Sequence, residues 1–152
     1  KGFYNYSEGS RAPNPAPENE EIYKEISTKN NIQRREISDQ EIVDRCILAL
    51  VNEGARILEE GVAQRSGDMD IVYINGYGFP IWRGGPMFYA NQLGLEEVMK
   101  KMEIFSDLDK EFWKPAPLLQ KLADQSATFG EAPAVEERAE LLSFKEANMG
   151  GV

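Results

Sequence analysis

The chain has 152 residues, 41% of them hydrophobic and 28% charged, which predicts one globular domain with tails. Its formal net charge of −9 argues against a nucleic-acid partner, whose phosphates it would repel. The chain has no histidine, and its one cysteine is Cys46. This composition excludes an internal disulfide, a Cys/His zinc site and histidine-based catalysis. We therefore expect no catalytic residue, no cofactor or metal site, and a reducing, cytoplasmic location.

Residues 1–37 are predicted to be a linker together with the end of a preceding domain. The chain begins KGFYNYSEG, without an initiating Met, and looks like a piece of something longer. The segment Gly9–Glu18 carries three prolines and no apolar period, which is typical of a linker. A short helix is predicted at Ile22–Ile26.

A helical domain is predicted over residues 38–128, and it opens with a long helix. Ser38 and Glu41 have the spacing of a capping box. Apolar residues then recur at helical spacing, which predicts one helix from about Asp39 to about Gln64. Its apolar stripe is wide enough to be buried from two directions. The stripe comprises Val43, Ile47, Leu50, Ile57, Leu58 and Val62.

Four shorter helices and a tail complete the predicted organisation. The helices are expected at 66–76, Pro86–Leu93, Leu95–Phe105 and Leu118–Asp124. No convincing alternating strand pattern is present, so the expected fold class is all-α, a helical bundle. Residues 129–152 are predicted to be a tail with one candidate helix at Val135–Phe144. No apolar run approaches the roughly 20 residues of a membrane span.

The stretch Ile74–Tyr89, INGYGFPIWRGGPMFY, allows two interpretations. Nucleotide-binding loops need a third glycine where this chain has Ile81, and they follow a strand rather than a helix. The favoured interpretation is a structural turn between helices. The alternative is an anion site, in which the Gly84–Gly85 N–H groups and Arg83 contact the ligand. The residues assigned to the turn are Gly76, Gly78, Pro80, Gly84, Gly85 and Pro86.

Glu53 is predicted to be a buried carboxylate. On the long helix it shares a face with Cys46, Leu50 and Ile57. A buried carboxylate must be hydrogen-bonded or carry a raised pKa. A structural anchor is favoured over a general base, because no nucleophile or second titrating partner is in view.

Two segments carry a family resemblance: ALVNEGARILEEGVAQRSGDMD and YINGYGFPIWRGGPMFYANQLGL. They resemble the last domain of the multifunctional fatty-acid β-oxidation enzymes, which combine enoyl-CoA hydratase and NAD-dependent 3-hydroxyacyl-CoA dehydrogenase activities. The resemblance covers roughly Ser38–Asp124. It implies a helical domain like that at the C-terminus of 3-hydroxyacyl-CoA and 6-phosphogluconate dehydrogenases.

The resemblance also implies which copy of the domain this is. In the multifunctional chains this C-domain occurs twice, and its first copy carries an Asn-Arg pair early in the long helix. That pair falls on Asp44-Arg45 here, so the Asn is absent, which implies the second copy. NAD, its binding domain and the catalytic His–Glu pair would then belong to upstream parts of a parent protein acting on acyl-CoA.

Two functions follow as hypotheses. In the first, the chain is a non-catalytic structural domain that packs against the sister C-domain and the NAD-binding domain of the same parent chain. In the second, it is a binding module that contacts CoA or an acyl chain through Arg83 and the Gly84–Gly85 turn. The isolated chain is expected to be inactive and to form a homodimer.

Overall fold

The computed structural model of the chain describes residues 3–132. It divides into two compact units, Lys1–Ser38 and Asp39–Val152. Each unit is described on its own. The candidate helix at Val135–Phe144 lies outside the described residues.

The first unit is a small hairpin followed by one helix. Strand β1 (Tyr4–Tyr6) pairs antiparallel with β2 (Pro13–Pro15), and helix α1 follows at Asn19–Lys29. Strand β2 lies within Gly9–Glu18, the segment predicted to be a linker. Both strands of a two-stranded hairpin are edge strands. Proline is tolerated in them because the outer edge of each strand needs no N–H donor for pairing.

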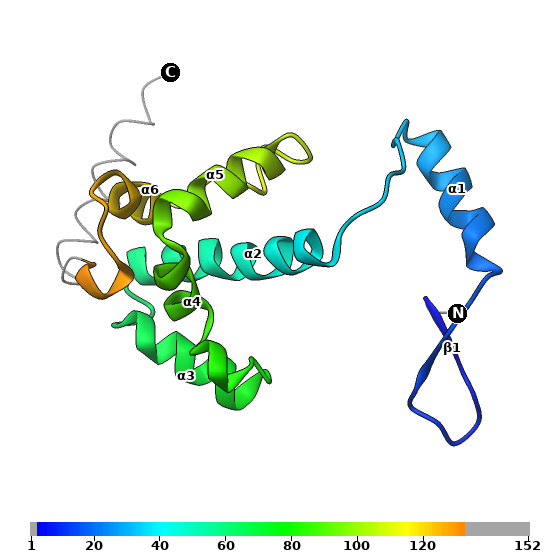
Figure 1. Cartoon of the computed structure of the whole chain (residues 1–152), viewed down its shortest axis with the longest axis horizontal. Helices are drawn as coiled ribbons and strands as arrows, with labels where there is room; N and C mark the ends of the chain where they lie inside the picture. Colours follow the sequence, from blue (N-terminus) through cyan, green and yellow to red (C-terminus); the bar gives the residue numbers. More distant parts are fainter. Residues whose placement is uncertain (1–2, 133–152) are drawn as a thin grey trace. The chain divides into compact units, whose positions relative to one another are not determined.

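The second unit is helical, and the all-α fold class is confirmed (Figure 1). Its α-helices are α2 (Asp39–Glu59), α3 (Ser66–Gly76), α4 (Pro86–Leu93), α5 (Leu95–Ser106) and α6 (Pro117–Asp124). Two 3-10 turns, η1 (Ile81–Arg83) and η2 (Phe129–Glu131), complete it. The long helix ends at Glu59 rather than near Gln64, because Gly61 turns the chain with φ 72°.

The core of this unit forms around α2, which runs between α5 and α3 in Figure 1. The buried face of α2 repeats at helical spacing and packs against α4, α5 and α6. Because each shorter helix contributes one apolar face, the helices close over α2 from several directions. Fully buried members of this core are Leu48, Val51, Ala55, Met87, Val98, Met102, Leu119 and Leu122.

A second apolar face of α2 is left uncovered by the described helices. Val43 is exposed, Leu50 is only partly buried, and Ile47 and Ile57 are partly buried against the margin of the core. Cys46 on the same side is exposed as well. The apolar residues of α2 thus point in two directions, and the described part of the chain covers one of them.

Candidate functional site

The turn between α3 and α4 depends on glycine at specific positions. Gly78, Gly84 and Gly85 have φ of 72°, 75° and 98°, a region that other residues rarely adopt. A Cβ added at Gly85 would lie 2.6 Å from the Asp70 Cα, so this position is also a close backbone approach. Gly76 shows neither feature, since its φ is ordinary and the space around it is open.

Asp70 on α3 caps the start of α4. Its carboxylate accepts hydrogen bonds from the backbone N–H groups of Met87, at 2.8 Å, and Phe88, at 3.1 Å. The side chain is 8% exposed, and burial raises the pKa of the carboxyl above its ordinary value despite these two donors. A carboxylate thus already occupies the N–H groups that a phosphate would use at this helix start.

Arg83 lies beside this turn but makes a different set of contacts. Its guanidinium is 4.4 Å from the centre of the Trp82 ring and 5.2 Å from that of Tyr89. Arg83 and Trp82 are both exposed. The structure therefore places Arg83 on an aromatic surface next to the turn.

Glu53 is not buried, so the prediction for this residue was wrong. Its side chain is 61% exposed, and it forms an ion pair of 3.2 Å with Arg56. The error has a clear origin: apolar residues at helical spacing lie on both sides of α2, and Glu53 and Cys46 lie on the exposed side. An exposed carboxylate paired with arginine is typical of a solvated helix surface.

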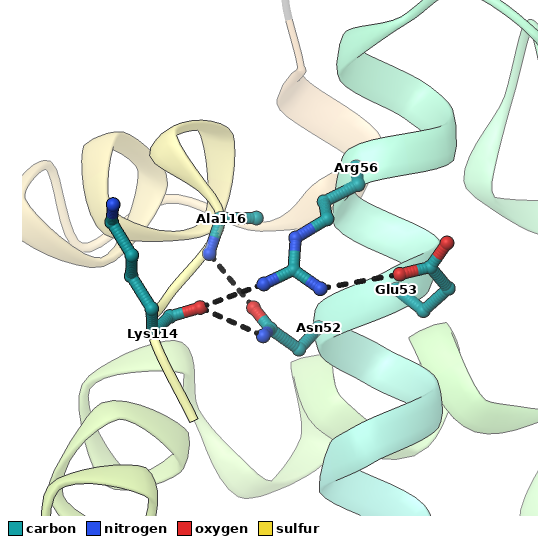
Figure 2. A network of polar contacts seen from close by, with 5 residues as sticks. All are labelled: Asn52, Glu53, Arg56, Lys114 and Ala116. Carbon is teal, nitrogen blue, oxygen red and sulfur yellow. Dashed lines mark hydrogen bonds and ion pairs between the residues drawn. The ribbon is translucent and has the colours of Figure 1, made fainter. Parts of the chain in front are cut away.

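The buried polar residues of α2 are instead Asp44, Asn52 and Glu59, and Asn52 was not identified from the sequence. Its side-chain amide donates to the Lys114 carbonyl at 3.0 Å and accepts from the Ala116 N–H at 2.8 Å. Figure 2 shows this clamp, with Arg56 donating to the same Lys114 carbonyl at 2.9 Å. The sequence could have indicated this residue, because Asn52 lies at helical spacing from Leu48 and Ala55, which are both on the buried face.

A second buried polar contact joins α2 to α5. The Asp44 carboxylate accepts from the Lys101 ammonium at 2.6 Å and from the Gln40 amide at 2.8 Å. The hydrogen bond to Asp44 raises the pKa of Lys101. Asp44 stands where the resemblance gives the first copy an Asn, and here that position holds two helices together.

An open groove lies between α2 and α3; we call it the α2–α3 groove. It has a volume of about 570 Å³ and is lined mainly by apolar side chains, together with Glu53 and Asp68. Its apolar lining includes Leu50, Ile57, Met69, Val72, Tyr77 and Met87. Because Leu50 and Ile57 line it, the groove coincides with the uncovered face of α2.

Residues 3–132 hold no cluster of three or more His, Cys, Asp or Glu side chains arranged to bind a metal ion. None of the described helices is long and apolar enough to cross a membrane.

Comparison with known proteins shows which family contains this chain. Residues 42–133 match the 3-hydroxyacyl-CoA dehydrogenase, C-terminal domain. The chain belongs to this family. The peroxisomal bifunctional enzyme of Danio rerio is 42% identical over 125 residues, covering 80% of this chain and 17% of that protein. The human peroxisomal bifunctional enzyme is 38% identical over 128 residues, covering 82% and 18%.

A plant relative extends the match. The glyoxysomal fatty acid beta-oxidation multifunctional protein MFP-a of Brassica napus is 33% identical over 144 residues, covering 93% of this chain and 20% of that protein. The chain therefore spans about a fifth of the length of these relatives. The region matched to the 3-hydroxyacyl-CoA dehydrogenase C-terminal domain contains Asn52, Asp70 and the whole turn before α4.

Proposed function

We propose that this chain is the non-catalytic, structural C-terminal domain of a multifunctional β-oxidation protein, packing against a sister C-domain to complete its dehydrogenase part. The observation that carries the proposal is the use of its buried polar side chains. Asp44 and Asp70 each join two helices of the domain, and Asn52 joins α2 to the 114–116 segment that precedes α6. A reacting group would instead have to face a substrate.

The parent protein, in this proposal, is an NAD-dependent 3-hydroxyacyl-CoA dehydrogenase that also hydrates enoyl-CoA. The family match supports the dehydrogenase part, and the names of the relatives support a parent with more than one activity in β-oxidation. NAD then belongs to an upstream domain, and the residues 1–37, 38–128 and 129–152 correspond to the end of the preceding domain, the C-domain and a tail. The cytoplasmic location stays a prediction, because the animal and plant relatives are named for peroxisomes and glyoxysomes.

The alternative binding module has weaker support. It needs free N–H groups at the Gly84–Gly85 turn, but the Gly84 N–H already donates to the Ile81 carbonyl at 3.1 Å, and the N–H groups of Met87 and Phe88 that follow bind Asp70. Arg83 alone would be left to contact a CoA phosphate. One exposed arginine on an acidic chain is a poor basis for recognising a polyanion.

A turnover assay with a binding assay tests the proposal. The isolated chain is incubated with NAD and a 3-hydroxyacyl-CoA, and NADH formation is followed. In parallel, CoA is titrated into the chain and into an Arg83→Ala variant by calorimetry. We expect neither turnover nor saturable binding. Turnover by a pure sample would refute the non-catalytic role, and CoA binding lost in Arg83→Ala would favour the alternative.

A further inference from the structure

The α2–α3 groove leaves apolar surface open among residues 3–132. On its α3 side Val72 is 55% exposed, and Tyr77 beyond the end of that helix is 76% exposed. On its α2 side Leu50 and Ile57 are only partly buried. A segment that covers this groove removes apolar side chains from water, which is a favourable change in free energy.

The described part of the chain ends on the helices that form this groove. The turn η2 packs against α3 and α4, and both of these helices contribute to the groove lining (Figure 1). Phe129 in η2 is buried, its N–H group donates to the Asn91 side chain on α4 at 2.9 Å, and Ala132 packs against the core. From Ala132, three further residues reach up to about 10 Å, roughly the width of a helix. The chain can therefore enter the groove by residue 135.

The sequence after residue 132 has an apolar stripe that suits the groove. Val135, Ala139 and Leu142 recur at helical spacing within the helix predicted at Val135–Phe144. A helix of that length spans about 15 Å, and α3, with 11 residues, spans about 16 Å. The predicted helix is thus as long as the groove wall against which it would lie.

The charges of the groove and of this segment are complementary. The groove lining contains two carboxylates, Glu53 and Asp68, and no basic residue. On a helix, Arg138 lies next to the apolar stripe, whereas the glutamates at 136, 137 and 140 lie away from it. Asp68 already binds an arginine with both oxygens, but within residues 3–132 the ion pair of Glu53 engages Oε2 alone. Glu53 is therefore the carboxylate that can accept a second cation.

We propose that residues 133–152 fold back over the α2–α3 groove of their own chain. The stripe of Val135, Ala139 and Leu142 lies in the groove, and Arg138 pairs with Glu53. Methionine side chains in the lining adapt to the shape of this stripe. Because the segment is covalently attached, its effective concentration at the groove is in the millimolar range, so a modest intrinsic affinity keeps the groove covered.

This cover does not depend on the proposed scaffolding role. An open groove in the isolated chain would contradict the cover and leave the scaffolding role intact. Turnover by the isolated chain would contradict only the scaffolding role.

Thiol labelling of the full chain tests the cover. In a Cys46→Ser background, which removes the native thiol, Val72→Cys places a thiol in the groove lining. Ile71→Cys places one at the neighbouring exposed position of α3, outside the groove. Leu142→Ala should raise the maleimide labelling rate of the Val72→Cys chain at least about tenfold, because the cover then opens more often. The rate of the Ile71→Cys chain should not change.

A matched control and a charge exchange make the test specific. Glu137→Ala, on the opposite side of the predicted helix, should leave the labelling rate of the Val72→Cys chain unchanged. Glu53→Arg should raise that rate, and adding Arg138→Glu should lower it again by restoring an opposite-charge pair. Circular dichroism confirms that all variants are folded.

Three results would overturn the proposal. In the first, Leu142→Ala leaves the Val72→Cys rate unchanged, which means that the groove is open. In the second, Leu142→Ala accelerates the Val72→Cys and Ile71→Cys chains equally, which reports a general loosening of α3. In the third, protection of the Val72→Cys thiol rises with protein concentration, since a second copy would then be the occupant.

Discussion

Asn52 joins the middle of α2 to the chain segment that enters α6. One amide there satisfies both a carbonyl and an N–H group of the 114–116 segment (Figure 2). Ala116 is fully buried, so water cannot replace Asn52 as the acceptor for its N–H group. The position of α6 over α2 therefore depends on this side chain.

Replacing Asn52 should be costly for that reason. We expect Asn52→Ala to lower the free energy of unfolding by about 1–3 kcal/mol, because it leaves a buried N–H group unsatisfied. Asn75→Ala is the control: Asn75 is exposed on α3 and donates only to the Ile71 carbonyl of its own helix. Urea denaturation measures both variants. Equal, small losses would mean that the clamp contributes little.

Asp70 and Asp68 lie two residues apart and should respond to pH in opposite directions. Burial raises the folded-state pKa of Asp70, so its contribution to stability is greatest in acid and falls as pH rises through that raised value. Arg65 lowers the pKa of Asp68, so its contribution is present above the ordinary Asp pKa and is lost in acid.

Unfolding free energies measured from about pH 3 to pH 7 test this difference. Relative to Asp70→Asn, the wild-type chain should lose stability as pH rises. Relative to Asp68→Asn, it should gain stability over the acid end of the same range. Slopes of the same sign for both variants would contradict the assigned environments.

Among the elements, the bounds of α3, α4, α5 and α6 could be predicted, whereas the end of α2 and its buried face could not. Pro86 at the first position of α4 and Gly94 after its end are local signals, and the predicted bounds of that helix match the structure. The face of α2 is decided by which neighbours pack on it. Since apolar residues lie on both sides of α2, helical period alone could not separate Leu48 and Val51 from Leu50 and Ile57.

The turn between α3 and α4 offers a graded test of its glycines. Gly76→Ala should be nearly neutral, because that site is open and has ordinary φ. Gly78→Ala should cost about 1 kcal/mol for a positive φ in open space. Gly85→Val should cost more, about 1–3 kcal/mol, since it adds a clash with Asp70 to the strained φ.

Thermal melting of the three variants ranks these effects. The predicted order of melting temperature is Gly76→Ala highest, then Gly78→Ala, then Gly85→Val. If Gly85→Val melted like the wild-type chain, the turn would be roomier than described, and the anion-binding alternative would gain support.

At the scale of the whole molecule, the family could be predicted from the sequence, whereas the candidate sites could not. The Gly/Pro spacing of residues 74–89 is a local pattern, so it carried the resemblance that the family match then bore out. The hairpin in the first unit has strands of three residues each, too short for an alternating pattern to register. The exposure of Glu53 and the capping role of Asp70 depend on how the helices pack on one another, which no local pattern records.

The scaffolding role is tested most directly by adding the chain back to a relative that lacks it. The Danio rerio peroxisomal bifunctional enzyme is prepared without the region matched by this chain, and NAD-dependent oxidation of a 3-hydroxyacyl-CoA is measured with and without the isolated chain. We predict that removing the region abolishes the oxidation and that adding the chain restores part of it, although the chain alone is inactive. Undiminished activity in the shortened enzyme would contradict the account.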